Sequence, residues 1–194
     1  MERAFKVIGL ALLYVLAFFI VELFGVVHPY AWTYSAVIAA VTASWPYFKL
    51  CQRYPIPGVA MLCAILYLIC SFIFGQGHEF LMLGCFGFGL IAEGLRKLFG
   101  NYRGRVGVIA SYMVMSLIPF SKTCVLWIDF ETASSMFGKY MFAFRDIYYA
   151  TLGRMLSFPM LTAMIVITLA LAFITMWILT RNWRPSDWFK RDDE

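Results

Sequence analysis

The sequence predicts an all-α integral membrane protein with six transmembrane helices and both termini in the cytoplasm. Hydrophobic residues make up 62% of the 194-residue chain, only 14% are charged, and the mean hydropathy is +0.78. Soluble domains are closer to half apolar and a quarter charged. The apolar residues gather in runs of about 20, the length of a helix that crosses a bilayer. Because these runs lack strand alternation, and lipid admits only helices or closed barrels, they are predicted to be helices.

Six apolar segments are expected to span the membrane within a single membrane domain, residues 1–194. They cover residues 4–27, 30–50, 57–74, 79–99, 104–127 and 158–180. The basic start of the chain is similar to that of a signal peptide. No A-x-A-like cleavage site ends the first run, however, so we expect a retained span. Pro46 and Pro119 fall inside or near spans and are expected to kink them.

The distribution of basic residues predicts the orientation. Six spans place both termini on one side, and four of the 16 Lys and Arg residues then fall on the other side. These four are Lys122, Lys139, Arg145 and Arg154. Because Lys and Arg accumulate in cytoplasmic flanks, the termini and the tail 181–194 are expected in the cytoplasm. The turns near residues 28 and 75–79 then face outward, and the net charge of +5 reflects topology rather than binding to nucleic acid.

The outward connection 129–157 is too long to be a bare link, and such loops are often functional. Its residues 134–149 are rich in aromatic side chains and are typical of a short amphipathic helix. This helix is expected to anchor the loop at the membrane interface, to act as a lid over the outer mouth of the bundle, or both.

Several kinds of chemistry find no support in the sequence. The five cysteines lack paired metal-ligand spacing, so neither a disulfide framework nor a zinc site is expected. The chain contains no G-x-x-x-x-G-K-[ST], H-E-x-x-H or G-x-S-x-G motif, and it has only two histidines. We therefore expect neither catalytic residues, nor a covalently bound cofactor, nor ATP hydrolysis by this chain.

Two acidic residues inside apolar segments need an account, since a charge in a bundle costs about 2.5–3.5 kcal/mol on insertion scales. Glu22 lies one to two turns from the outer end of the first span. It is expected either to reach the outer headgroups or, as we favour, to serve as a polar anchor in an outward-facing cavity. Glu93 lies near the inner end of the fourth span, at pairing distance from Arg96 and Lys97. A local ion pair at the cytoplasmic surface is the favoured interpretation, and contact with a cytoplasmic partner is the alternative.

Polar and aromatic residues at the outer ends form the candidate binding site. A small-molecule site needs aromatic walls and a few converging polar groups, which these residues supply at similar predicted depth. The candidate substrate-binding residues are His78, Glu79, Gln76, Glu22, His28, Trp32, Tyr34 and Trp127. The alternative for the two histidines is that they are solvated surface residues. Imidazoles would also suit a metal or haem-like ligand.

Small residues recur every four positions at Ala36, Ala40 and Ser44, and again at Cys85 and Gly89. This spacing allows helices in lipid to approach closely. Packing within the bundle is the expected role, and a sliding contact with another membrane subunit is the alternative.

An ordered set of short motifs resembles one known family. The motifs are PGVAM (57–61), GQGHE (75–79), IAEG (91–94), NYR (101–103) and SY (111–112). In this order the chain, from about residue 5 to 180, resembles the Trep-Strep or MptD-like family of substrate-binding S components of energy-coupling factor (ECF) transporters. The resemblance implies a six-helix S-component bundle in a prokaryotic plasma membrane, with cargo bound near the outer face under the outer turns. It also implies partners, namely a transmembrane coupling subunit and two cytoplasmic ATPases.

The cargo implied by this reading is a small micronutrient such as a vitamin, a haem-like tetrapyrrole or a metal chelate. The rival hypothesis is a stand-alone ion-coupled carrier or channel, which would usually place several polar residues at mid-membrane depth, and Glu22 is the only candidate for such a position. A third hypothesis is a membrane enzyme acting on a lipid, with His78 and Glu79 as an acid–base pair.

Overall fold

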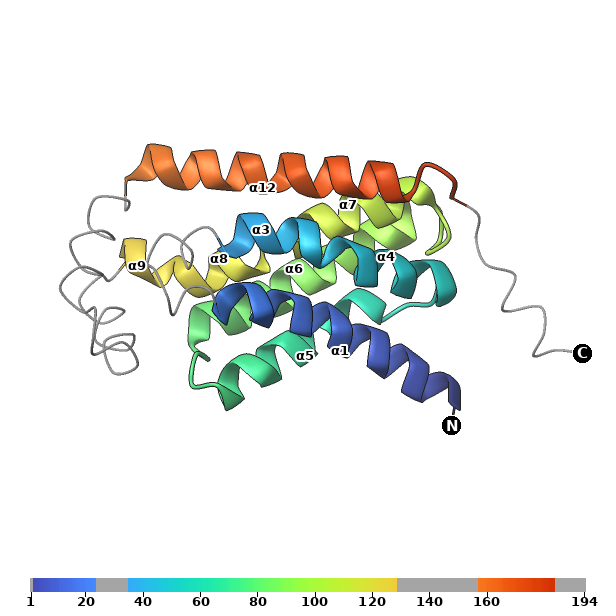
Figure 1. Cartoon of the computed structure of the whole chain (residues 1–194), viewed down its shortest axis with the longest axis horizontal. Helices are drawn as coiled ribbons and strands as arrows, with labels where there is room; N and C mark the ends of the chain where they lie inside the picture. Colours follow the sequence, from blue (N-terminus) through green and yellow to red (C-terminus); the bar gives the residue numbers. More distant parts are fainter. Residues whose placement is uncertain (1, 24–34, 129–156, 184–194) are drawn as a thin grey trace, which may run out of the picture.

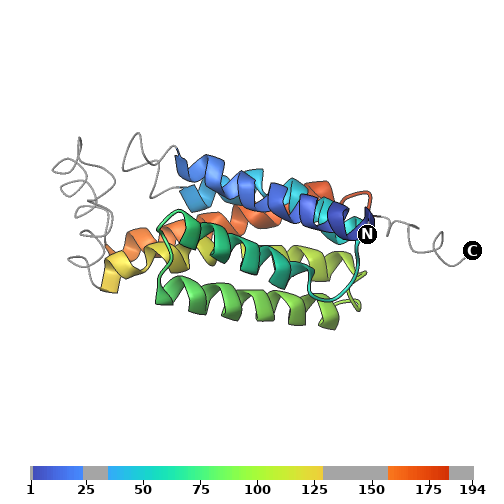
Figure 2. The ribbon, with the colours of Figure 1, turned by 90° about the horizontal axis from the view of Figure 1, so that it is seen from below.

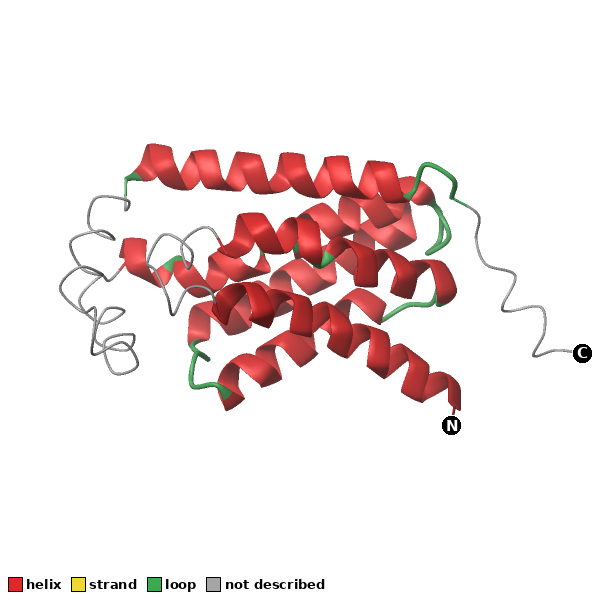
Figure 3. Cartoon of the chain, viewed as in Figure 1, coloured by secondary structure: helices red, strands yellow, loops and turns green. Residues whose placement is uncertain are grey.

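A computed structural model shows how the apolar segments fold, and it describes residues 2–23, 35–128 and 157–183 (Figure 1). These residues form α-helices joined by turns (Figure 3). The helices are α1 (Glu2–Leu23), α3 (Ser35–Thr42), α4 (Ser44–Arg53), α5 (Val59–Ile73), α6 (Glu79–Leu98), α7 (Arg105–Met115), α8 (Ile118–Thr123), α9 (Val125–Ile128) and α12 (Phe158–Leu179). Each predicted span coincides with one helix or with a series of consecutive helices. The predicted amphipathic helix at 134–149 and most of the tail lie outside the described residues.

Two prolines divide spans that the sequence predicts as single helices. A proline has no N–H for the carbonyl four residues earlier, and its ring clashes with that carbonyl. The residue four before Pro46 is Thr42, where α3 ends, and the residue four before Pro119 is Met115, where α7 ends. The chain continues in nearly the same direction after each break, so that α3–α4 and α7–α8–α9 each form one broken span (Figure 1). Each proline therefore lies just after a break between consecutive helices, whereas the sequence predicts a kink within one helix.

The spans lie side by side in one elongated bundle. In Figure 1, α12 runs along one side, α1 and α5 run along the opposite side, and the broken span α3–α4 lies between them. Figure 2 shows α5 between α1 and α6. Helix α6 packs against α5, α7 and α8, while α12 packs against α3, α4 and α7. The first and last described residues lie at the same end of the bundle, as an even number of spans requires (Figure 1).

Among the described residues, three helical stretches are long and apolar enough to cross a membrane by themselves, namely Arg3–Leu23, Arg105–Thr123 and Phe158–Leu179. The broken span α3–α4 is divided into pieces that are too short. Helix α6 has sufficient length, but it carries Glu79, Glu93, Arg96 and Lys97. Of these, Glu79 and Lys97 are exposed, so the charges that neighbouring helices have to accommodate are those of Glu93 and the buried Arg96.

The centre of the bundle is a chain of buried aromatic rings. The ring centroid of Tyr14 lies 5.7 Å from that of Tyr47, which lies 5.2 Å from that of Tyr112. The hydroxyl of Tyr112 donates to the carbonyl of Ala40 at 2.7 Å, and Tyr47 shares a hydrogen bond of 2.9 Å with Ser111. Aromatic pairs contribute packing energy beyond their buried area, and a buried tyrosine hydroxyl requires a partner. Because the hydroxyls of Tyr47 and Tyr112 have hydrogen-bond partners, these tyrosine rings can be buried in the core.

The small residues of the second span contribute to packing inside the bundle. Ala36, Ala39, Ala40, Ala43 and Ser44 are all buried. Similarly, a side chain added to Gly89 of α6 would press against Met61 and Ala64 of α5, so glycine allows these two helices to approach closely. The expected role in close helix packing is therefore the one observed.

Candidate binding site at one end of the bundle

A buried polar cluster joins three helices near the end of the bundle opposite the termini. Lys122 of α8 donates from Nζ to Oε2 of Glu22 in α1 at 2.6 Å. The hydroxyl of Tyr67 in α5 donates to the other oxygen of the same carboxylate at 2.6 Å. Lys122 also donates to Oε1 of Gln76, in the turn between α5 and α6. Residues up to 100 positions apart in the chain therefore meet in one network.

The cluster is charged but almost completely withdrawn from the surface. Lys122 is 1% exposed and Glu22 is 7% exposed. The ring of Phe19 lies beside both the cluster and Tyr67, with its centroid 5.8 Å from Lys122 Nζ and 5.6 Å from the Tyr67 centroid. Burying two charges is costly, and their attraction compensates only when geometry is good and further hydrogen bonds complete the site. Tyr67 and Gln76 provide these bonds, so the ion pair is neutral overall and fully enclosed.

The motif at residues 75–79 explains how Gln76 reaches this cluster. The N–H of Gln76 donates to the carbonyl of Ser71 at 2.8 Å, and the N–H of Gly75 donates to that of Phe72 at 3.0 Å. This pair of bonds is a Schellman motif, which ends a helix with a residue in the left-handed conformation. Gly75 occupies that position with φ of 70°. The sequence therefore ends α5 at a defined residue and fixes the backbone of Gln76.

His78 holds the other side of the same turn. It is the N-cap of α6, and its Nδ1 accepts from the backbone N–H of Leu81 at 3.3 Å. Because Nδ1 accepts, the neutral ring carries its proton on Nε2, which donates to the carbonyl of Lys122 at 2.9 Å. Burial lowers the pKa of His78 from its ordinary value of 6.5, and the nearby Lys122 charge acts in the same direction. The imidazole is therefore a neutral link between α6 and α8.

The structure brings together only part of the candidate site that the sequence predicts. Glu22, Gln76 and His78 meet around Lys122, whereas Glu79 is an exposed residue at the start of α6. Trp127 lies in α9, five residues beyond Lys122, and is partly buried. His28, Trp32 and Tyr34 lie outside the described residues.

Lys122 is the central residue that sequence reasoning missed. The predicted topology counts Lys122 among the four basic residues on the outer side of the membrane, although it lies inside the predicted fifth span. A usable signal was present, because Glu22 and Lys122 are opposite charges placed near the outer ends of two apolar segments. Such charges in a membrane bundle usually pair with each other.

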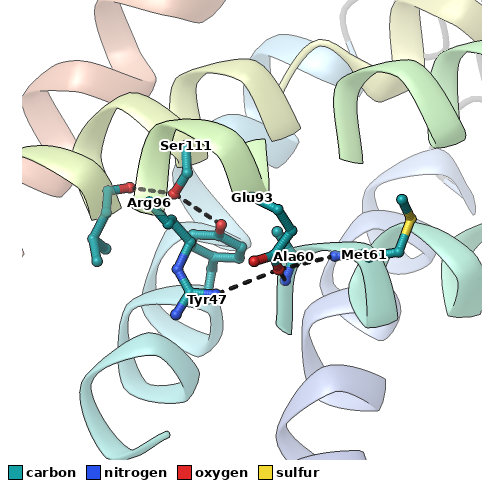
Figure 4. A network of polar contacts seen from close by, with 7 residues as sticks. Tyr47, Ala60, Met61, Glu93, Arg96 and Ser111 are labelled. Carbon is teal, nitrogen blue, oxygen red and sulfur yellow. Dashed lines mark hydrogen bonds and ion pairs between the residues drawn. The ribbon is translucent and has the colours of Figure 1, made fainter. Parts of the chain in front are cut away.

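A second polar cluster lies where α5 begins and α6 approaches its end, and Figure 4 shows it from close by. Oε1 of Glu93 in α6 accepts from the backbone N–H of Ala60 at 2.5 Å and from that of Met61 at 3.4 Å. Helix α5 begins after Gly58, which has no side chain to cap it. The carboxylate of one helix thus provides the N-terminal cap of its neighbour, where the helix dipole also favours an anion.

The same carboxylate pairs with Arg96, whose Nη1 lies 3.5 Å from Glu93 Oε1. This ion pair is the one that the sequence predicts, but Arg96 is fully buried inside the bundle rather than at the surface. The guanidinium lies over the ring of Tyr102, with 5.5 Å between Cζ and the ring centroid. Within the described part of the chain, Arg96 Nε and Nη2 and Glu93 Oε2 are buried without hydrogen-bond partners.

Comparison with known protein families gives a match over almost the whole chain. A family model described as "Hypothetical bacterial integral membrane protein (Trep_Strep)" matches residues 6–182. The chain belongs to the Trep_Strep family. The match agrees with the family resemblance of the sequence motifs and with the apolar helices of the structure, so this Trep_Strep protein is a multi-pass protein of a bacterial cell membrane. No curated protein and no solved structure matches the chain.

Both polar clusters of this Trep_Strep protein lie at helix ends and not in the central aromatic core. In the described residues, no group of three or more His, Cys, Asp and Glu side chains is arranged to hold a metal ion. The cluster around Lys122 combines an ammonium, a carboxylate, an amide, a phenol and an imidazole. Such a set of hydrogen-bonding groups is suited to binding a polar part of a small molecule.

Proposed function

We propose that the protein is the substrate-binding S component of an ECF-type importer, which captures a small micronutrient at the outer face of the membrane. The observation that carries this proposal is the buried ion pair between Lys122 and Glu22. Charged residues inside a membrane bundle are expensive and commonly mark a substrate or ion pathway. Here they lie next to the turn at 75–79, which contributes the side chain of Gln76 to the cluster.

In this proposal the turn at 75–79 closes the outer side of the cargo site. Lys122 contacts the polar part of the cargo, with Glu22 and Gln76 beside it, while His78 positions α8 and α6 around it. The predicted residues Glu79, His28, Trp32, Tyr34 and Trp127 would complete the walls. A vitamin, a haem-like tetrapyrrole or a metal chelate fits an aromatic rim of this kind.

The energy for import would come from partner proteins. The sequence has no P-loop, so the proposal assigns ATP hydrolysis to two cytoplasmic ATPase subunits and force transmission to a transmembrane coupling subunit. The basic residues at the end that carries the termini agree with a cytoplasmic location of that end.

Purification from native membranes tests the proposal. A tagged chain, solubilised in mild detergent, is expected to retain one coupling subunit and two ATPases, identified by mass spectrometry. A tagged unrelated six-span protein from the same membranes serves as the control. Recovery of the chain without these partners, together with uptake by vesicles that contain the chain alone, would overturn the proposal.

The Lys122–Glu22 pair also supports the rival hypothesis of an ion-coupled carrier, since a bound proton or cation would disrupt it. Reconstitution separates the two functions. The carrier hypothesis requires solute flux in vesicles that contain only this chain and an ion gradient. The S-component proposal requires that flux appear only with the coupling subunit, the ATPases and ATP.

A further inference from the structure

The two acceptors that surround the Lys122 ammonium are unequal. Glu22 is a charged acceptor and is held a second time by Tyr67, which is 2% exposed in the core. Gln76 is a neutral acceptor, is less deeply buried, and belongs to the turn rather than to a helix. A molecule that enters at this end of the bundle would therefore displace Gln76 more easily than Glu22.

We infer that the side-chain carbonyl of Gln76 is a placeholder, occupying on Lys122 the position that a carboxylate of the cargo takes. The inference rests on the proposed function and specifies the chemical class of its cargo. The bond from Lys122 to Gln76 has one ionised partner, whereas a bond from Lys122 to a carboxylate has two and adds the attraction between opposite charges. A carboxylate therefore competes well against the amide, whereas a cation would meet the ammonium before it could reach Glu22.

The surrounding structure permits this exchange. The backbone of Gln76 is held by its N–H bond to Ser71, and the turn is tied to α8 by the bond from His78 to the carbonyl of Lys122. Neither bond involves the Gln76 side chain. The amide can therefore rotate away from Lys122 while the turn keeps its conformation, and Lys122 remains paired with Glu22 throughout.

Mutation of a placeholder and mutation of a cargo ligand change the affinity for the cargo in opposite directions. Removing a placeholder eliminates a competitor and strengthens binding, whereas removing a ligand weakens binding. Gln76→Ala is therefore expected to bind the cargo about tenfold to a hundredfold more tightly, the equivalent of one hydrogen bond to a charged group. Gln76→Glu would place a permanent carboxylate on Lys122 and is expected to abolish binding.

The experiment is affinity selection of small molecules by the purified full-length chain, with mass spectrometry as the readout. The probes are a library of water-soluble vitamins and related carboxylic acids, each paired with its methyl ester. The wild-type chain is expected to retain at least one acid and not its ester. The double variant Glu22→Gln/Lys122→Met removes both charges together, so that neither is left buried alone, and it is expected to lose the acid. Lys49→Met, at the other end of the bundle, is the control for removal of a lysine.

Three results would overturn the inference: equal retention of acids and esters, weaker binding by Gln76→Ala, or retention of no acid by any variant. A thermal unfolding curve for each variant excludes loss of fold as the cause. Because the assay uses the chain alone, its outcome is independent of the partners. Selective acid binding in this assay, together with recovery of the chain without ATPases or coupling subunit from native membranes, would leave this inference standing and remove the S-component proposal.

Discussion

The Lys122 ammonium lies 2.6 Å from the Glu22 carboxylate, although 100 residues separate them in the chain. This contact connects the end of α1 to α8. Both side chains are too deeply buried for water or salt to screen their attraction. Removing one partner leaves the other as an unpaired charge in an apolar bundle, while removing both leaves none. The pair is therefore open to a clear mutational test.

We expect Lys122→Met to destabilise the protein by about 3–5 kcal/mol, because it leaves Glu22 buried without its counter-charge. The double variant with Glu22→Gln should recover most of this loss, since a neutral amide can still accept from Tyr67. Thermal or denaturant unfolding in detergent measures both effects. Equal stability of the single variant and the wild type would show that the pair is not buried in this way.

Glu93→Gln is expected to destabilise the protein by about 3 kcal/mol or more, since it removes the counter-charge of the buried Arg96. The same change weakens the N-terminal cap of α5. The matched control is Lys97→Gln, which changes an exposed residue of the same helix turn and should alter stability by less than about 0.5 kcal/mol. If the two variants lose equal stability, the assignment of Glu93 as the cap of α5 and the ion-pair partner of Arg96 fails.

Gly75 and Gly94 should respond in opposite directions to replacement by alanine. Gly75 has φ of 70° in the turn after α5, and a side chain in that conformation costs about 1–2 kcal/mol. Gly94 lies within α6, with nothing within 4 Å of an added Cβ, so alanine there should stabilise the helix by about 0.5–1 kcal/mol. Unfolding measurements on the two variants check this, and a loss at Gly94 alone would contradict it.

The stability of the wild-type protein should fall as the pH decreases below about 6.5. The lowered pKa of His78 means that the unfolded chain takes up a proton more readily than the folded chain. The stability contributed by neutral His78 is thus complete above its ordinary pKa and is lost as the pH falls through the lowered value. A second ring proton would also remove the Nδ1 acceptor for Leu81.

His78→Asn isolates this effect, because asparagine is a good N-cap and does not titrate. Unfolding temperatures at pH 7.5 and pH 5 should differ less for this variant than for the wild type. Identical pH dependence in the two proteins would assign the effect to other groups.

Length, hydropathy and proline positions were sufficient to predict the helices. Residues 79–99 become α6, Glu79–Leu98, and residues 158–180 become α12, Phe158–Leu179. The breaks before Pro46 and Pro119 follow from local chemistry as well, since the missing N–H acts four residues earlier on the same helix. These features depend on residues that are close together in the chain, so they can be predicted from the sequence alone.

The composition of the candidate site was less predictable, because it depends on contacts between distant residues. The sequence identifies Glu22, Gln76 and His78 individually, but no local pattern indicates that Lys122 lies between them. Likewise, the spacing of Glu93 and Arg96 predicts their ion pair, but not that Glu93 caps α5. Which faces of two helices meet is a property of the packed bundle.

The most direct test of the proposed capture site is to determine on which side of the membrane it lies. Glu79→Cys places a thiol at an exposed position beside the site, and Lys97→Cys places one at an exposed position near the opposite end of α6. Intact cells are treated with a membrane-impermeant maleimide, and labelling of the wild-type protein with its five cysteines gives the background. We expect residue 79 to be labelled in intact cells and residue 97 only after permeabilisation. Labelling of residue 97 from outside, with residue 79 protected until the cells are opened, would contradict the account.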